Sequence, residues 1–110
     1  MEKRRFARIQ VNLMLKFKKL ETFEDALDGS ARDLSQGGIC ITTRTVKPVG
    51  TRVQIEFPIP GSDPMEIKGT VRSIRYNNGK PAAMGIEFDE FEGQAQGVIQ
   101  YLIKKHQPKE

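Results

Sequence analysis

The sequence predicts a small, predominantly β domain, built as an antiparallel barrel or sandwich and followed by one C-terminal helix. Apolar and polar residues alternate in several short segments, which is the pattern of half-buried strands. Glycine, proline and asparagine separate these segments, and near the end apolar residues recur every three or four positions. The 110 residues predict one domain, residues 1–110, with a single core.

The first strand is expected over residues 9–17, where every odd position is apolar. Its even positions are polar except Met14, so one face should be buried and the other solvated. A second strand is expected to end at Leu34. The turn at residues 35–38 then separates it from a third strand at residues 39–42.

A fourth strand is predicted over residues 51–57, after the chain is broken at Pro48 and Gly50. Three apolar residues alternate there with polar ones: Val53, Ile55 and Phe57. Residues 58–64 contain three prolines, which cannot donate ladder hydrogen bonds, so this segment is expected to be a loop.

The fifth strand, residues 66–76, changes its alternation part of the way along. Ile67 and Val71 share one phase, whereas Ile74 and Tyr76 fall on the opposite phase. One extra residue near positions 72–73 restores the register, so a bulge or sharp bend is predicted there.

The Asn-Asn-Gly at residues 77–79 predicts a tight turn, because asparagine and glycine tolerate positive φ. The sixth strand follows, with an apolar face of Met84, Ile86 and Phe88. Residues 90–105 then predict an amphipathic helix with Asp89 as its N-cap. Gly93 and Gly97 weaken this helix by about 1 kcal/mol each, so it should depend on docking to the barrel.

Composition excludes several classes of protein. Apolar residues make up 37% of the chain and charged residues 29%, and no apolar run is long enough to insert into a membrane. The basic start of the chain is not followed by the apolar segment of a secretory signal. One cysteine, Cys40, allows no internal disulfide, which fits a reducing compartment. A cytoplasmic location is therefore expected.

The positive charge is concentrated at one end. Residues 1–19 carry seven basic groups and one acidic group, for a net charge of +6, while the whole chain has a net charge of +4. Proteins that bind long nucleic acid usually spread positive charge over a whole face. Confined charge suits a small anion better, although a simple solvated basic tail remains an alternative.

Two short strings carry the functional signal: Arg4-Arg5-Phe6-Ala7-Arg8 and Asp33-Leu34-Ser35-Gln36-Gly37-Gly38. Each arginine offers a rigid fork of donors that pairs with phosphate oxygens or with the O6 and N7 atoms of guanine. An ionised Asp33 accepts hydrogen bonds from guanine or braces an arginine, and Ser35 donates or accepts. The two glycines permit positive φ and lack the Cβ that would obstruct a base. The alternative for the second string is an ordinary β-turn in which side chains cap their own backbone.

Together the two strings resemble the PilZ domain pattern, R-x-x-x-R followed by D/N-x-S-x-x-G, with no residue missing. The similarity extends to Gly50 and to the Gly-Ile-Glu-Phe of residues 85–88. The resemblance implies a bacterial, six-stranded antiparallel β-barrel with a C-terminal helix. It also implies a receptor that binds the second messenger cyclic di-GMP and is not an enzyme.

The implied ligand-binding residues are Arg4, Arg5, Arg8, Asp33, Ser35, Gly37 and Gly38. Arg72 and Arg75 flank the expected bulge and are further candidates, with solvated strand charges as the alternative. In the expected mechanism, ligand orders a basic arm (residues 1–8) on the barrel (residues 9–88). The signal then passes to a downstream protein that the sequence does not identify.

The sequence also bears on three other function classes. An enzyme or zinc protein is not expected, because the chain has one histidine, His106, and one cysteine, and neither catalytic residues nor a cofactor are legible. A binder of single-stranded nucleic acid would need exposed aromatic platforms, but there is no tryptophan and most aromatic residues are in phase with the core. A PilZ-like protein-interaction module without nucleotide binding remains open.

Overall fold

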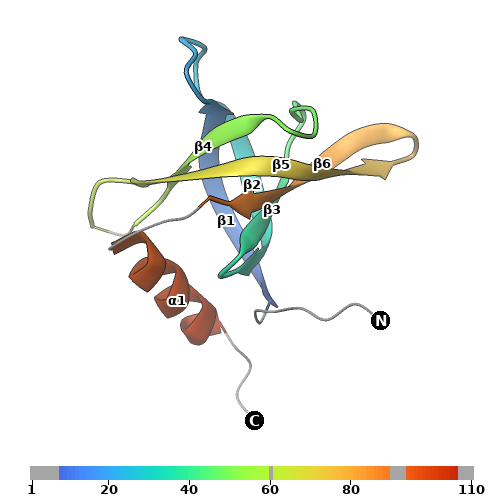
Figure 1. Ribbon diagram of the computed structural model, residues 1–110. Helices are drawn as coiled ribbons and strands as arrows, with labels where there is room; N and C mark the ends of the chain where they lie inside the picture. The colour runs from blue at the N-terminus through green and yellow to red at the C-terminus, as the bar shows by residue number, and fades with distance from the viewer. Residues whose placement is uncertain (1–7, 60, 90–93, 107–110) are drawn as a thin grey trace.

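The computed structural model describes residues 8–59, 61–89 and 94–106. Within them, six antiparallel strands close into a barrel in the order β1-β2-β3-β6-β5-β4, followed by one helix (Figure 1). The barrel closes because β1 pairs with both β2 and β4. The elements are β1 (Arg8–Lys19), β2 (Leu27–Ser35), β3 (Gly38–Thr42), β4 (Arg52–Phe57), β5 (Met65–Asn77), β6 (Lys80–Phe88) and α1 (Gln94–His106). The predicted six-stranded antiparallel barrel with a C-terminal helix is confirmed.

The apolar sides of the alternating strands fill the barrel. In β1 the odd positions are buried, or half-buried at Leu13, whereas the even positions from Gln10 to Lys16 are exposed. The largest fully buried side chains come from all six strands and the helix: Phe17, Phe57, Leu34, Ile41, Ile55, Ile67, Met84, Ile99, Val53 and Val71. The period of two in the sequence therefore corresponds to one continuous core.

The fifth and sixth strands form a long hairpin that extends past the barrel (Figure 1). The pairing of β5 with β6 shifts register between Val71 and Ser73, which confirms the predicted bulge. At the tip, Asn78 (φ 54°) and Gly79 (φ 79°) both lie in the left-handed region. Two such residues are typical of a type I′ hairpin turn, as the Asn-Asn-Gly sequence predicted.

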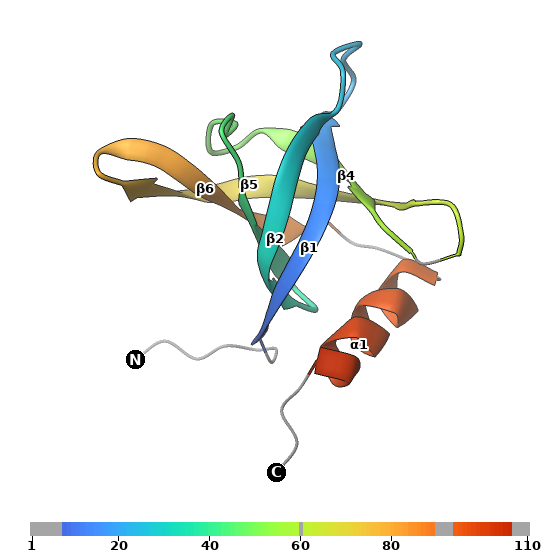
Figure 2. The same cartoon turned by 180° about the vertical axis from the view of Figure 1, so that it is seen from behind.

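The helix packs its apolar stripe against the barrel. Ile99 and Ile103 are buried in the same core cluster as the strands, and α1 contacts β1, β2 and β5. Figures 1 and 2 both show α1 toward the end of the barrel where β1 begins. No helix among the described residues is long and apolar enough to span a bilayer.

The expected start of this helix falls at residues 90–93, which lie outside the described residues. The N-cap role of Asp89 stays a prediction; its carboxylate accepts hydrogen bonds from Arg52 and from the Thr70 hydroxyl. These contacts fix the last residue of the barrel region against β4 and β5.

Candidate functional site

The strand register brings the two functional strings together. In the pairing of β1 with β2, Arg8 lies opposite Ser35 and Gln10 lies opposite Asp33. The residue at the end of the basic string therefore faces, backbone to backbone, the strand end that carries the acid and the hydroxyl. The register defines one surface, at the end of the barrel where β1 begins, that we call the motif surface: Arg8, Gln10, Asp33, Ser35 and Gly38.

The motif surface lies on the outside of the barrel. Ile9 and Leu34 pair with each other and are both buried, so Gln10 and Asp33, which are next to them along each strand, point outward. Gln10 is exposed and Asp33 is half-buried. A ligand held here would lie against the outer wall and not inside the core.

Two irregularities in the ladder set this orientation. The register shifts between Gln10 and Leu13 where β1 pairs with β2, and between Ala31 and Asp33 where β2 pairs with β3. Ala31 and Leu34 are both fully buried although they are three residues apart. The extra residue reverses the phase of β2, and so it directs Asp33 outward beside the start of β1. The sequence analysis did not predict these two bulges.

Asp33 is the acidic group of the motif surface. Its carboxylate has no hydrogen bond or ion pair with any other described residue. An ionised carboxylate only accepts hydrogen bonds, so this group is available to donors from a ligand or from an arginine. Cys40 lies opposite Asp33 on β3 and is buried.

Ser35 has its hydroxyl oxygen directed into the turn that follows it. The oxygen accepts hydrogen bonds from the backbone N–H groups of Gly37 (3.1 Å) and Gly38 (3.2 Å). The hydroxyl also donates to the Gly38 carbonyl oxygen, at a longer Oγ–O distance of 3.4 Å. The side chain therefore stabilises the turn, as in the ordinary β-turn alternative. Its donated hydrogen bond is long and weak, so the hydroxyl hydrogen is the part of the group most available to a ligand.

The glycines of this turn do not use positive φ. Among the described residues, the glycines in the left-handed region are Gly50, Gly61 and Gly79, and neither Gly37 nor Gly38 is one of them. A Cβ on Gly38 would lie 2.4 Å from the Ile86 carbonyl oxygen. Glycine is required at this position because the β6 backbone passes too close for any side chain.

The structure separates the two further arginine candidates. Arg72 Nε donates to Glu87 Oε1 at 2.8 Å, and Glu87 pairs with Gly38 across β3 and β6. Arg72 is thus held beside the motif surface. Arg75 lies opposite Ala83, towards the far end of the β5–β6 hairpin, and is not brought to this surface.

The remaining site predictions fall outside the described residues. Arg4 and Arg5 lie in residues 1–7, and of Arg8 only the backbone is described. One residue of the motif surface, Gln10, and one residue beside it, Glu87, were not predicted. The alternation of residues 9–17 predicts only that Gln10 is solvated. Glu87 enters the sequence analysis only as part of the Gly-Ile-Glu-Phe of residues 85–88. Only the pairing register reveals where either residue lies.

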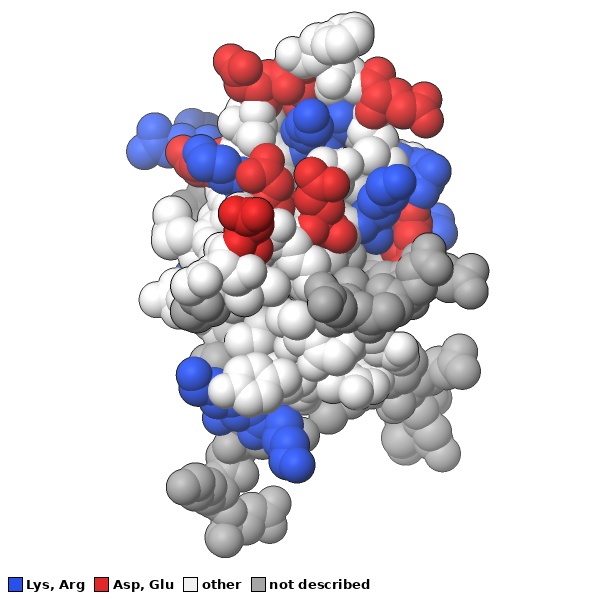
Figure 3. Space-filling model, turned by 90° about the vertical axis from the view of Figure 1, so that its left-hand side faces the viewer, with Lys and Arg blue, Asp and Glu red and all other residues white. Residues whose placement is uncertain are grey.

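Within residues 8–59, 61–89 and 94–106, no three His, Cys, Asp or Glu side chains gather in a way that could hold a metal ion. Figure 3 shows acidic and basic side chains mixed over the upper part of one face, above an uncharged band. The described residues of this face therefore form no continuous basic track of the kind that long nucleic acid requires.

Comparison with known proteins gives one family and several solved structures. The family model described as the PilZ domain matches residues 2–105. Among curated proteins, no match was found. The structure of the PilZ domain with c-di-GMP of YcgR from Escherichia coli is similar over 96% of this chain and 92% of its own, with a TM-score of 0.72 and 20% identity.

Two longer proteins are also similar. The Bacillus subtilis inhibitor of motility MotI/DgrA matches with a TM-score of 0.69 and 20% identity. The K. pneumonia MrkH–c-di-GMP complex matches with a TM-score of 0.73 and 12% identity. Each match covers 96% of this chain, which spans about half the length of either protein (52%). At these identities the likeness concerns the fold.

Proposed function

The chain belongs to the PilZ domain family, whose model covers residues 2–105, and on this premise we propose that it is a receptor for cyclic di-GMP. The proposed site consists of Arg4, Arg5, Arg8, Asp33, Ser35, Gly37 and Gly38, with Arg72 as a further contact. The domain acts by binding and carries out no catalysis.

The pairing of Arg8 with Ser35 is the observation that supports this proposal most. The basic string and the acid–hydroxyl–glycine turn are about thirty residues apart in sequence, and nothing in their composition requires them to meet. In the fold, the last residue of the basic string, Arg8, pairs with Ser35 at the start of that turn. Two structures similar to this chain, from YcgR and MrkH, are complexes with c-di-GMP, which adds to the support.

The chemistry of the surface fits the ligand. Cyclic di-GMP carries two phosphates and two guanines, so it presents anionic oxygens, O6 and N7 acceptors, and N1–H and N2–H donors. Arginine guanidinium groups pair with the first two classes of atom. The carboxylate of Asp33, which no described residue engages, accepts from the third. Ser35 and Gly38 fix the turn that holds this carboxylate in place.

Calorimetric titration with cyclic di-GMP tests the proposal, with GTP and cyclic di-AMP as control ligands. We expect Arg8→Ala and Asp33→Ala each to weaken binding at least about tenfold, because losing one partner of a buried charge pair costs roughly 2–5 kcal/mol. Lys68→Ala, which removes an exposed cation elsewhere on β5, is the matched control and should leave affinity unchanged. Wild-type affinity for cyclic di-GMP in Arg8→Ala and Asp33→Ala, as in Lys68→Ala, would contradict the proposed site.

The proposal includes ordering of the N-terminal arm, residues 1–8, when the ligand binds. Bridging guanidinium groups to the 33–38 turn through an anionic ligand would fix the arm on the barrel wall. Hydrogen exchange of the backbone amides of residues 2–8 should slow on adding cyclic di-GMP and should not slow in Asp33→Ala at the same concentration. Protection that is equal with and without ligand would rule out ordering as the response.

The proposal also includes a downstream protein that recognises the domain with its arm ordered. A PilZ-like interaction module without nucleotide binding is the alternative. It is distinguished by the titration itself, since such a module takes up no cyclic di-GMP at any concentration tested.

A further inference from the structure

The loop that joins β1 to β2, residues 20–26, presents an unusual aromatic side chain. Figures 1 and 2 both show this loop projecting from the end of the barrel opposite the motif surface. Phe23 at the loop is fully exposed, with a relative accessibility of 106%. The other described phenylalanines, Phe17, Phe57 and Phe88, are all buried. A single exposed apolar residue is common, so its surroundings decide whether it has a role.

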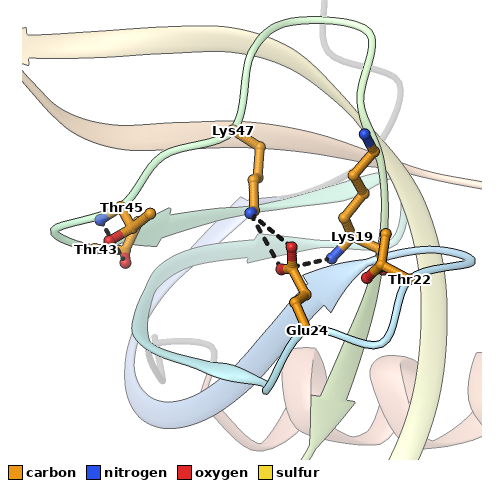
Figure 4. Close-up of polar contacts among 6 residues, drawn as sticks. All are labelled: Lys19, Thr22, Glu24, Thr43, Thr45 and Lys47. Carbon is orange, nitrogen blue, oxygen red and sulfur yellow. Dashed lines mark hydrogen bonds and ion pairs between the residues drawn. The ribbon is translucent and has the colours of Figure 1, made fainter.

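Polar contacts hold the loop in a defined shape on both sides of Phe23 (Figure 4). The Glu24 carboxylate receives hydrogen bonds from Lys47 Nζ (3.3 Å) and from the Lys19 backbone N–H (3.3 Å). The Thr22 hydroxyl donates to the Lys19 carbonyl oxygen at 2.9 Å. The residues before and after Phe23 are therefore anchored, which lowers the entropy that a contact through Phe23 would lose.

The charge around Phe23 is opposite in sign to that of the whole chain. Residues 20–28 contain four acidic groups and no basic group, although the chain has a net charge of +4. Glu24 and Asp28 are neutralised by ion pairs with lysines. Glu21 and Asp25, two residues on either side of Phe23, are exposed and have no partner among the described residues. The loop thus presents an apolar side chain between two unpaired carboxylates.

A groove on the outer wall, next to this loop, has the complementary character. It encloses about 690 Å³ and is lined by apolar side chains from three strands: Met14, Leu27, Pro81 and Ala82. Arg44 also lines it, is exposed, and has no ion-pair partner among the described residues. Asp28 lies at the groove as well, but Lys16 offsets its charge at 2.9 Å. The volume is in the range of small-ligand pockets and is large enough for one phenyl ring.

We propose that this groove accepts the Phe23 loop of a second copy of the chain, so that the domain forms a dimer through the end of the barrel away from the motif surface. Phe23 of one copy enters the groove of the other, and Glu21 and Asp25 pair with Arg44. The chain's own Phe23 cannot fill its groove, because it is fully exposed. Loop and groove adjoin through Leu27, so both contacts form at once about a two-fold axis, which closes the assembly at two copies.

Charge favours this occupant over other macromolecules. The unpaired carboxylates beside Phe23 repel anionic lipid and nucleic acid. The groove of the same chain supplies the apolar pocket and the cation that the loop requires. Both the loop and the groove are therefore accounted for by a second copy of the chain.

Sedimentation equilibrium of the full chain measures the association over concentrations from about 10 μM to about 1 mM. This range is high because an interface made only of one loop and one groove from each copy is small, and small interfaces bind weakly. We expect a reversible shift from the monomer mass of 12.4 kDa towards twice that value. Phe23→Ser and Arg44→Glu should each raise the dissociation constant at least about tenfold. Both side chains are exposed, so the thermal unfolding midpoint of the dilute protein should stay the same.

Two further variants make the test specific. Tyr101→Ser removes another exposed aromatic ring (62%) from α1 and should leave the association unchanged. Combining Arg44→Glu with Glu21→Arg and Asp25→Arg exchanges the charges across the contact and should restore dimers. A chain that stays monomeric at the highest concentration would overturn the proposal. Dimers that are insensitive to Phe23→Ser and Arg44→Glu, or equally sensitive to Tyr101→Ser, would do so too.

Discussion

Single residues of the motif surface have structural roles in addition to the ligand contacts that we propose for them. Gly38 is the clearest case, because the Ile86 carbonyl oxygen occupies the place of its missing side chain at 2.4 Å from the position of a Cβ. Ser35 is another, since its hydroxyl closes the turn while remaining a candidate ligand contact. The stability of any variant at these positions must therefore be measured before a change in its binding is interpreted.

Gly38→Ala should destabilise the fold by about 1–3 kcal/mol, the usual cost of inserting a methyl group into space that has none. The obstructing atom belongs to the β6 backbone, so β3 and β6 must separate locally to accept the methyl group. Urea unfolding followed by circular dichroism measures the change. An unaltered transition midpoint would mean that the two strands move apart without cost.

Glu24 provides a prediction for acid stability. Hydrogen bonds from the Lys47 ammonium and then from the Lys19 backbone N–H lower the pKa of Glu24 below its ordinary value. Because the pKa is lower in the folded state, the stabilisation is present above the pKa of the unfolded chain. It is lost as pH falls through about 4.3 and then through the lower folded value.

Thermal unfolding between pH 7 and pH 3 tests this. The unfolding temperature of the wild-type chain should fall further between pH 7 and pH 3 than that of Glu24→Gln, since glutamine has no charge to lose. Parallel curves for the two proteins over that range would show that the carboxylate does not contribute.

At the scale of elements, the helix depends on its packing. Ile99 and Ile103 are buried on its inner side, whereas Gly97 is exposed and a Cβ there would meet nothing within 4 Å. Gly97 therefore has no packing role in the described structure. Its effect on stability is the larger loss of backbone conformational entropy that glycine undergoes on folding.

Gly97→Ala should raise the free energy of unfolding by about 0.5–1 kcal/mol, because alanine restricts the unfolded chain and fits the helix. The matched control is Gly79→Ala in the β5–β6 turn. There φ is 79°, so alanine is strained and should destabilise by roughly 1–2 kcal/mol. Chemical denaturation of the two variants should give changes of opposite sign; the same sign would refute the conformational account.

At the scale of the whole molecule, the sequence predicted the number of strands and their positions along the chain, the bulge in β5, the hairpin turn and the helix. These features follow from local periodicity and turn residues, such as the phase change between Val71 and Ile74. The sequence did not predict the bulges beside Asp33, because no single strand shows which residues its neighbours place opposite it. For the same reason Gln10 and Glu87 were missed, and the positive φ considered for the Gly37–Gly38 pair was wrong.

The candidate site was predicted only in part. Two linear strings indicated which residue types to expect, and the register showed that Arg8 and Ser35 adjoin. Arg4 and Arg5 remain predictions from the motif alone. Arg72 and Arg75 looked equivalent in sequence, and only the three-dimensional pairing with Glu87 distinguishes them.

The start of β1 and the end of α1 lie towards the same end of the molecule (Figures 1 and 2). A bulky tag fused close to the start of β1 or to the end of α1 would consequently lie near the motif surface and leave the Phe23 loop accessible. Immobilisation for ligand measurements is better made through a label at the β5–β6 hairpin tip, where Lys80 offers an exposed amine on the scaffold itself.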